Sequence, residues 1–199
     1  IFFSGCNLRC LFCQNYEISH GGKGLEVSES ELVDCMLYLQ DIGAHNINLV
    51  TPSNYTNLLQ STLEKAKPIV KLPIVWNSSG YETVANLKKM DGLVDVYLPD
   101  FKYSDDDLAW EYSHAKGYRE AALAALEEMR RQQPNDVFDN DGMMQKGVIV
   151  RHLVLPGQIE NTVDALRDIA SVDKSLYVSL MGQYFPTDNV KNHPTLSRR

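Results

Sequence analysis

The feature that most constrains the fold is a regular alternation of short apolar segments with helical segments along 199 residues. Alternation of this kind predicts parallel strands joined by right-handed crossovers. The apolar segments are nearly continuous, which suits a sheet that is covered on both faces. The expected strands are 1–4, 46–50, 73–76, 94–100, 147–155 and 176–181, and the expected helices are 28–43, 54–67, 80–90, 105–113, 118–132 and 161–170.

Six strand–helix units predict an α/β fold, a partial (β/α)6 TIM-type barrel with parallel strands, short of the eight units of a closed barrel. A doubly wound open sheet is the competing architecture. In both, functional groups lie at the carboxyl ends of the strands. The length suits a single domain over 1–199. Because the chain opens on Ile1 within an apolar run, we expect a fragment that lacks an upstream segment.

Charge and hydropathy exclude several classes of protein. The net charge of −7, with no basic run, argues against nonspecific binding to nucleic acid. No apolar stretch approaches the ~20 residues of a membrane span, and no signal peptide is visible. We therefore expect a cytoplasmic protein, in a compartment where disulfides are rare.

Three cysteines, Cys6, Cys10 and Cys13, directly follow the first expected strand with the spacing C-x3-C-x2-C. Thiolates favour zinc, cuprous copper or iron–sulfur clusters. A structural zinc site takes four ligands, usually as two separated pairs, and no second pair is present. His20 or Cys35 could complete a set of four. Cys35, however, falls among core positions of the helix 28–43, and we interpret it as a small buried hydrophobe.

A [4Fe–4S] cluster usually has four cysteine ligands. Three cysteines leave one iron without a protein ligand, and an open iron is a binding position for another molecule. The cysteines alone leave open both a cluster and a zinc site with a further ligand.

The cysteine spacing, with Phe12 just before the last cysteine, resembles the signature of the radical S-adenosylmethionine (SAM) superfamily. Further segments resemble the branch of this superfamily called pyruvate formate-lyase activating enzyme-like, and the resemblance covers essentially the whole chain. The segments are "GCNLRCLFCQNYEIS", "NINLVTP", "NSSGYE", "VYLPDFKY", "RHLVLPG" and "SLMGQYFP".

The resemblance implies a function. Cys6, Cys10 and Cys13 would bind a [4Fe–4S] cluster, and the amino and carboxylate groups of SAM would chelate the open iron. Cleavage of SAM would yield a 5′-deoxyadenosyl radical that abstracts hydrogen, here from a glycine of a glycyl-radical enzyme. An electron donor such as flavodoxin or ferredoxin is a further expected partner, whereas nucleic acid and membrane are not. The alternative is a zinc-binding or catalytically inactive barrel scaffold.

Polar residues follow the second and third expected strands, where the family binds SAM. The family often has a Gly-Gly-Glu-type segment after the second strand. Thr51 and Ser53 occupy that place here and offer hydroxyl groups, but the carboxylate is absent. After the third strand, Asn77, Ser78 and Ser79 could contact ribose or carboxylate, although a simple turn into the next helix explains them equally well.

Charged residues mark the fourth and fifth strands. Asp100 and Lys102 resemble the Asp-x-Lys pair of glycyl-radical activases, and their alternation with Phe101 lets both point the same way. Arg151 interrupts an apolar strand, where a charge is costly unless paired, and its guanidinium suits a carboxylate. We interpret the neighbouring His152 as a core histidine with satisfied hydrogen bonds.

Two further segments complete the predictions. Residues 183–185 end the last strand, where an aromatic side chain could pack on adenine. The segment "DVFDNDGMM" does not match a calcium-binding loop, because valines occupy its first and last ligand positions, and it is interpreted as an acidic loop.

Overall fold

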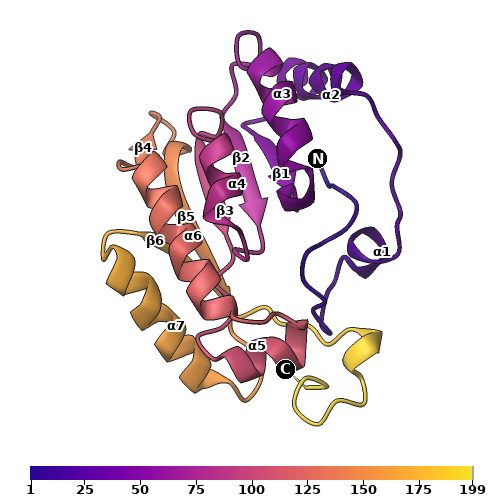
Figure 1. The fold of residues 1–199 in the computed structure, drawn as a ribbon, viewed down its shortest axis with the longest axis vertical. Coiled ribbons are helices and arrows are strands. Elements are labelled where there is room, and N and C mark those ends of the chain that lie inside the picture. The colour runs from indigo at the N-terminus through magenta and orange to yellow at the C-terminus, as the bar shows by residue number, and fades with distance from the viewer. Residues whose placement is uncertain (199) are drawn as a thin grey trace.

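A computed structural model describes residues 1–198 as a curved, mostly parallel sheet with helices along its outer face (Figure 1). The sheet order is β1-β2-β3-β5, with β4 and β6 both paired to β5. The predicted α/β fold and partial barrel are confirmed. The strands are β1 Ile47–Val50, β2 Ile74–Ser78, β3 Val96–Pro99, β4 Val137–Phe138, β5 Met144–Leu153 and β6 Tyr177–Met181.

Helices α2, α3, α4, α6 and α7 follow one another along one side of the sheet, whereas α5 lies at its end and α1 lies apart, in the N-terminal segment (Figure 1). Successive neighbours α2 and α3, α3 and α4, α4 and α6, and α6 and α7 contact one another. Within residues 1–198, no helix is both long and apolar enough to span a membrane. The helices are α1 Tyr16–Ser19, α2 Glu29–Asp41, α3 Thr56–Ala66, α4 Val84–Lys89, α5 Asp106–Ser113, α6 Tyr118–Gln132 and α7 Ile159–Val172, with short 3-10 turns η1 Ser53–Tyr55 and η2 Asp188–Val190.

The core lies between the sheet and these helices. β2 is buried along its whole length, as expected of a central strand covered on both faces. The capping box predicted for α2 is present: Ser28 Oγ accepts from Glu31 N–H at 3.3 Å, and the Glu31 carboxylate accepts from Ser28 N–H at 2.7 Å. Local signals therefore set where α2 begins.

The two ends of the sheet differ from the prediction. The expected first strand is reduced to a parallel bridge between Phe2 and Val50, because the chain leaves the sheet at once for the cysteine loop. β6 is parallel to β5 as predicted, yet Tyr177, Val178 and Leu180 are exposed because β6 is an edge strand of the described sheet.

Two local predictions were wrong. The "acidic loop" before β5 contains β4, which pairs antiparallel with the start of β5, so 137–146 form a hairpin. Cys35 is exposed instead of buried. The buried face of α2 runs through Leu32, Val33 and Met36, and this turns Cys35 toward solvent.

Candidate functional site

A cavity of about 530 Å³ lies at the carboxyl ends of the strands, between the sheet and the cysteine loop. This is the position that the barrel architecture predicts. Ser53 is not among the residues that line it, whereas the other predicted ligands and cofactor-binding residues are. Those that line it are Cys6, Cys10, Cys13, Thr51, Asn77, Ser79, Asp100, Lys102 and Arg151.

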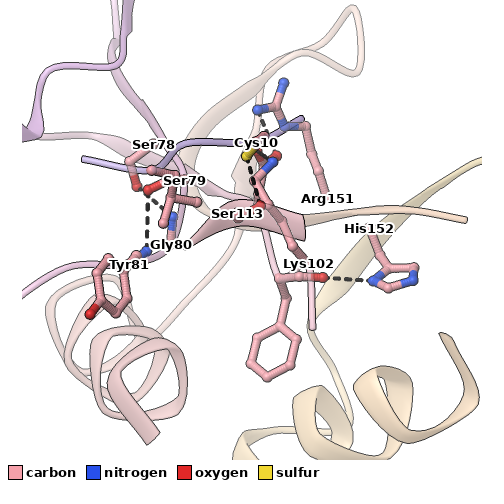
Figure 2. Close-up of polar contacts among 12 residues, drawn as sticks. Cys10, Ser78, Ser79, Gly80, Tyr81, Lys102, Ser113, Arg151 and His152 are labelled. Atoms are coloured by element: carbon pink, nitrogen blue, oxygen red, sulfur yellow. Dashed lines mark hydrogen bonds and ion pairs between the residues drawn. The ribbon is translucent and has the colours of Figure 1, made fainter. Parts of the chain in front are cut away.

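Each cysteine sulfur in the loop has a hydrogen-bond partner. Cys6 Sγ accepts from the N–H of Leu8 at 3.4 Å. Cys10 Sγ accepts from the hydroxyl of Ser113 at 3.0 Å, which is the shortest of the three contacts (Figure 2). Cys13 Sγ lies 3.3 Å from Ser19 Oγ. The loop therefore presents its thiols in a preset arrangement.

The loop has no regular secondary structure, and the end of α5 holds it in place. The N–H of Arg9 donates to the carbonyl of Ser113 and that of Leu11 to the carbonyl of Tyr112, both at 2.9 Å. These carbonyls belong to the last turn of α5, where a helix has no internal donors left for them. Leu8 and Phe12, two apolar residues of the loop itself, are buried.

Asn7 joins the two walls of the cavity. Its Oδ1 accepts from Ser79 Oγ at 2.9 Å, and its Nδ2 donates to the carbonyl of Tyr81. The cysteine loop and the loop after β2 are therefore tied together through one side chain.

Neither residue considered as a fourth ligand is available at the site. The ring of His20 is held at 2.7 Å from Ser19 Oγ and at 2.9 Å from the carbonyl of Leu8. Cys35 lies on α2, outside the cavity. Within the described residues, no three His, Cys, Asp or Glu side chains gather around a single ion position.

Burial raises the pKa of the Cys6 and Cys10 thiols, so metal binding there must displace their protons.

Asp100 is shared between two cations on the opposite wall. Lys102 Nζ donates to Asp100 Oδ2 at 2.6 Å, and Arg151 Nη2 lies 2.7 Å from Asp100 Oδ1. Burial, the largest single effect, lowers the pKa of Lys102, but the charge and hydrogen bond of Asp100, together with Cys10 and Tyr118, raise the pKa overall. Lys102 therefore stays charged. Asp100, Lys102 and Arg151 together carry a net charge of about +1.

Arg151 also has an unsatisfied donor. Its Nη2 donates to Asn77 Oδ1 at 2.7 Å, whereas its buried Nε has no partner within the described chain. The Oδ1 of Asn48, another residue of the cavity wall, is likewise buried without a partner. Buried polar atoms are nearly always paired, so these two mark places where a polar ligand would fit.

Ser53, whose contact with the cofactor stays a prediction, holds the loop after β1 in place. Its hydroxyl donates to Glu82 Oε1 at 2.7 Å, and Trp76 Nε1 donates to the same oxygen at 3.0 Å. Burial raises the pKa of the Glu82 carboxyl, and hydrogen bonds from Ser53, Trp76 and Ser78 lower it in part. The loop after β1 is thus fastened to a carboxylate supplied by the loop after β2.

Two backbone features fix the cavity wall. Thr51 has φ of 61°, which is rare for a β-branched residue, and its N–H donates to the Asn77 carbonyl at 2.8 Å. Gly80 has φ of +74°, and a Cβ there would lie 2.0 Å from the carbonyl oxygen of Asp100. Only glycine lets the β2 and β3 loops approach so closely.

His152 is the core histidine that the sequence predicts. It is fully buried, with Nδ1 2.6 Å from the carbonyl of Phe101 and Nε2 3.0 Å from Thr162 Oγ1. Burial lowers its pKa, so the ring stays neutral. Figure 2 shows His152 directed away from the cysteine loop.

Aromatic side chains close the remaining side of the cavity. Phe12 packs edge-on against Tyr184 with ring centroids 6.0 Å apart, and both line the cavity. Gln183 and Phe185 also line it, in keeping with the position predicted for an adenine contact. Beyond Cys13, the residues 14–15 reach the cavity, whereas Tyr16 begins α1 and stacks on the His20 ring.

Three supporting residues escape the sequence analysis. Glu82 and Ser113 fall within predicted helices, where a carboxylate or a serine is unremarkable. Tyr118, at the start of α6, is fully buried, and the single proton of its hydroxyl is shared between the carbonyls of Ser79 at 3.0 Å and Asp100 at 3.1 Å. The position of Glu82 within "NSSGYE" is the one signal that could have pointed to a role.

Comparison with known proteins gives one family. A family model described as the Radical SAM superfamily matches residues 1–170. Uncharacterized protein MJ0674 of Methanocaldococcus jannaschii is 30% identical over 210 aligned residues, which cover 100% of this chain and 57% of that protein. The chain therefore spans little more than half the length of this curated relative.

Solved structures share the fold at low identity. Methylornithine synthase (PylB) is 16% identical with a TM-score of 0.65, over 94% of this chain and 54% of that one. The hydrogenase maturase HydG from Carboxydothermus hydrogenoformans is 14% identical with a TM-score of 0.65, over 90% and 44%. SuiB of Streptococcus suis, solved with SAM bound, is 13% identical with a TM-score of 0.58, over 91% and 38%.

The donor set fits the cofactors of this family, a [4Fe–4S] cluster and SAM. Three cysteine thiols face the cavity without a fourth protein ligand among residues 1–198. Thiolates are the ligands that such clusters take. Across the cavity, the excess positive charge and the unpaired Nε of Arg151 suit the carboxylate of SAM.

Proposed function

The chain belongs to the radical SAM superfamily, and we propose that it cleaves SAM with a [4Fe–4S] cluster bound by Cys6, Cys10 and Cys13. The observation that carries the proposal is the placement of three thiols opposite a cationic wall in one cavity. When bound and reduced, the cluster would supply the one electron that breaks a carbon–sulfur bond of SAM, with methionine and a 5′-deoxyadenosyl radical as the two fragments.

The residues of the chain have distinct tasks in this proposal. Arg151, held by Asp100 and Asn77, orients the carboxylate of SAM. Asn77 and Ser79 present polar groups toward its ribose. Phe12 and Tyr184 exclude water from the side where the cysteine loop meets the end of β6.

Anaerobic reconstitution with iron and sulfide tests this proposal. We expect a visible iron–sulfur absorption band and, after reduction with dithionite and addition of SAM, release of 5′-deoxyadenosine. A protein without the band, or a band without SAM cleavage, contradicts the proposal.

The finer proposal is that the chain is a pyruvate formate-lyase activating enzyme-like protein that generates a glycyl radical in a partner enzyme. Two features support it: the Asp100–Lys102 pair, which resembles that of glycyl-radical activases, and the open edge of the barrel at β6, which could admit a protein loop. A peptide with Cα-deuterated glycine tests it. Deuterium in the released 5′-deoxyadenosine supports glycine as the hydrogen source, and unlabelled product contradicts it.

The proposal also names an electron donor and a compartment. Flavodoxin or ferredoxin would supply the electron, and the cytoplasm would keep the thiols reduced before the cluster is assembled. Replacing dithionite with reduced flavodoxin checks the donor, since product formation should persist.

The second candidate function is a zinc-binding or inactive scaffold. The observation in its favour is the absence of a carboxylate in the loop after β1, at Thr51 to Asn54, where the family often has one. Metal analysis of protein purified without oxygen separates the two functions. Iron with sulfide supports the enzyme, and zinc alone supports the scaffold.

A further inference from the structure

Cys10 differs from the other two cysteines because its hydrogen-bond donor is a buried side chain that has a second buried hydroxyl behind it. Ser113, which donates to Cys10 Sγ at 3.0 Å, is fully buried at the last position of α5 (Figure 2). Tyr103, also fully buried, places its hydroxyl 2.6 Å from Ser113 Oγ. Tyr103, Ser113 and Cys10 therefore form a continuous chain of hydrogen bonds that ends on sulfur.

The chemistry of the sulfur fixes the direction of this chain. A thiolate bound to iron carries no proton, so it can only accept. Ser113 has one proton, which goes to Cys10, so Ser113 must accept from Tyr103. Burial raises the pKa of Tyr103 well above its usual value, so the phenol keeps its proton. Successive hydrogen bonds that point the same way strengthen one another.

The other sulfurs have weaker or less direct donors. Cys6 accepts from the backbone N–H of Leu8 at 3.4 Å, a donor that does not depend on the side chain of Leu8. Ser19 lies 3.3 Å from Cys13, but its hydroxyl is also engaged by His20 Nδ1 at 2.7 Å. Of the two serine hydroxyls that contact a cysteine sulfur of the loop, that of Ser113 is the closer.

A donor to a cluster thiolate stabilises negative charge on sulfur. Reduction adds negative charge to the cluster, so the donor stabilises the reduced state more than the oxidised state and raises the reduction potential. We infer that Ser113, with Tyr103 behind it, raises the reduction potential of the cluster through Cys10, a role that rests on the proposed function of the cysteine loop.

The position of α5 explains how the fold keeps this donor in place. Asp105 caps the start of α5 by accepting from the N–H groups of Asp107 and Leu108, at 2.8 and 3.0 Å. At the other end, the carbonyls of Tyr112 and Ser113 accept from the cysteine loop. The hydroxyl and the main chain of Ser113 therefore approach the loop together.

Redox titration of the reconstituted chain, followed by EPR of the reduced cluster, tests this inference without SAM or substrate. Ser113→Ala should shift the midpoint potential to a more negative value. Tyr103→Phe should shift it in the same direction by less, because Ser113 remains a donor. Tyr97→Phe is the matched control: Tyr97 is also a buried tyrosine with a hydrogen-bonded hydroxyl, but that hydroxyl donates to Gln132, whereas the hydroxyl of Tyr103 contacts Ser113.

The outcomes distinguish two roles for Ser113: setting the reduction potential of the cluster, or only holding the cysteine loop in place. Iron loss in Ser113→Ala with an unchanged potential in Tyr103→Phe shows a merely structural role and overturns the inference. Equal potentials in all the variants overturn it as well. A wild-type chain that takes up no cluster contradicts the proposed function and this inference together, whereas a loaded cluster with no shift overturns this inference alone.

Discussion

The two walls of the cavity are held in place in different ways. The cysteine loop contains no strand or helix and depends on hydrogen bonds to the end of α5, to the His20 ring and, through its own Asn7, to Ser79. The opposite wall consists of strand ends, whose positions the parallel sheet fixes before any side chain is considered. The functional residues of the loop can be recognised from their spacing in the sequence. Those of the strand wall come together only because the sheet places the strand ends side by side.

This contrast predicts which substitutions abolish function and which weaken it. A change in the loop removes a ligand, for which no neighbour substitutes. A change in the strand wall alters one member of a network, in which Asp100, Lys102 and Arg151 share charge. The following predictions run from the largest expected effect to the smallest.

Cys10→Ala should abolish SAM cleavage, because the cluster would lose one of three protein ligands. Iron content and the visible band should fall to background, while the free energy of unfolding of the metal-free chain changes by about 1 kcal/mol. Cys35→Ala is the matched control, since Cys35 is exposed on α2, and it should load a normal cluster. A Cys10→Ala protein that still cleaves SAM would contradict the assignment.

Gly80→Ala should destabilise the strand wall by about 3 kcal/mol or more, since it adds a Cβ 2.0 Å from the Asp100 carbonyl to a strained φ of +74°. Gly92→Ala isolates the strain, because Gly92 has φ of +78° with nothing within 4 Å, and should cost about 1–2 kcal/mol. Urea unfolding measures both. Equal losses would show that the contact between the two loops is unimportant.

Arg151→Lys should weaken SAM binding about 10- to 100-fold, because an ammonium replaces a forked donor that contacts Asn77 and Asp100. Equilibrium binding to the reconstituted protein measures the effect. Arg119→Lys is the control: Arg119 makes a two-pronged pair with Asp168, outside the cavity, and its substitution should leave binding unchanged. Unchanged binding in Arg151→Lys would remove Arg151 from the site.

Glu82→Gln should have the smallest effect, a change in how stability depends on pH. Burial raises the pKa of Glu82 above its unfolded value of 4.5, so its contribution is present at low pH and is lost as pH rises through the folded pKa. Glutamine keeps the acceptor for Ser53 and Trp76 without ionising. The unfolding free energy of Glu82→Gln relative to wild type should therefore increase from pH 5 to pH 8. A constant difference would show that Glu82 does not titrate in this range.

The sequence predicts much of the fold because the relevant signals are local. Strand and helix alternation, the α2 capping box and the cysteine spacing each depend on neighbouring residues. The failures depend on the environment. Cys35 has helical spacing to Leu32 and Leu39, but the face that α2 buries is decided by its contacts with other elements.

The supports of the site are harder to predict from sequence than its ligands. Ser113 lies 103 positions from Cys10, and no spacing rule connects a helix C-terminus to a distant loop. Glu82 similarly reaches back to Ser53 across 29 positions. The position of Ser53 after a strand predicts a contact with the cofactor, but nothing in the sequence predicts the hydrogen bond from its hydroxyl to Glu82.

The central claim is that the three-cysteine cluster has an open iron that SAM occupies opposite Arg151. EPR spectra of the reduced, reconstituted chain with and without SAM test it most directly. The account predicts that SAM changes the spectrum of the wild-type cluster, because a new ligand joins an iron that no protein side chain holds. A loaded cluster whose spectrum is the same with saturating SAM would contradict the claim.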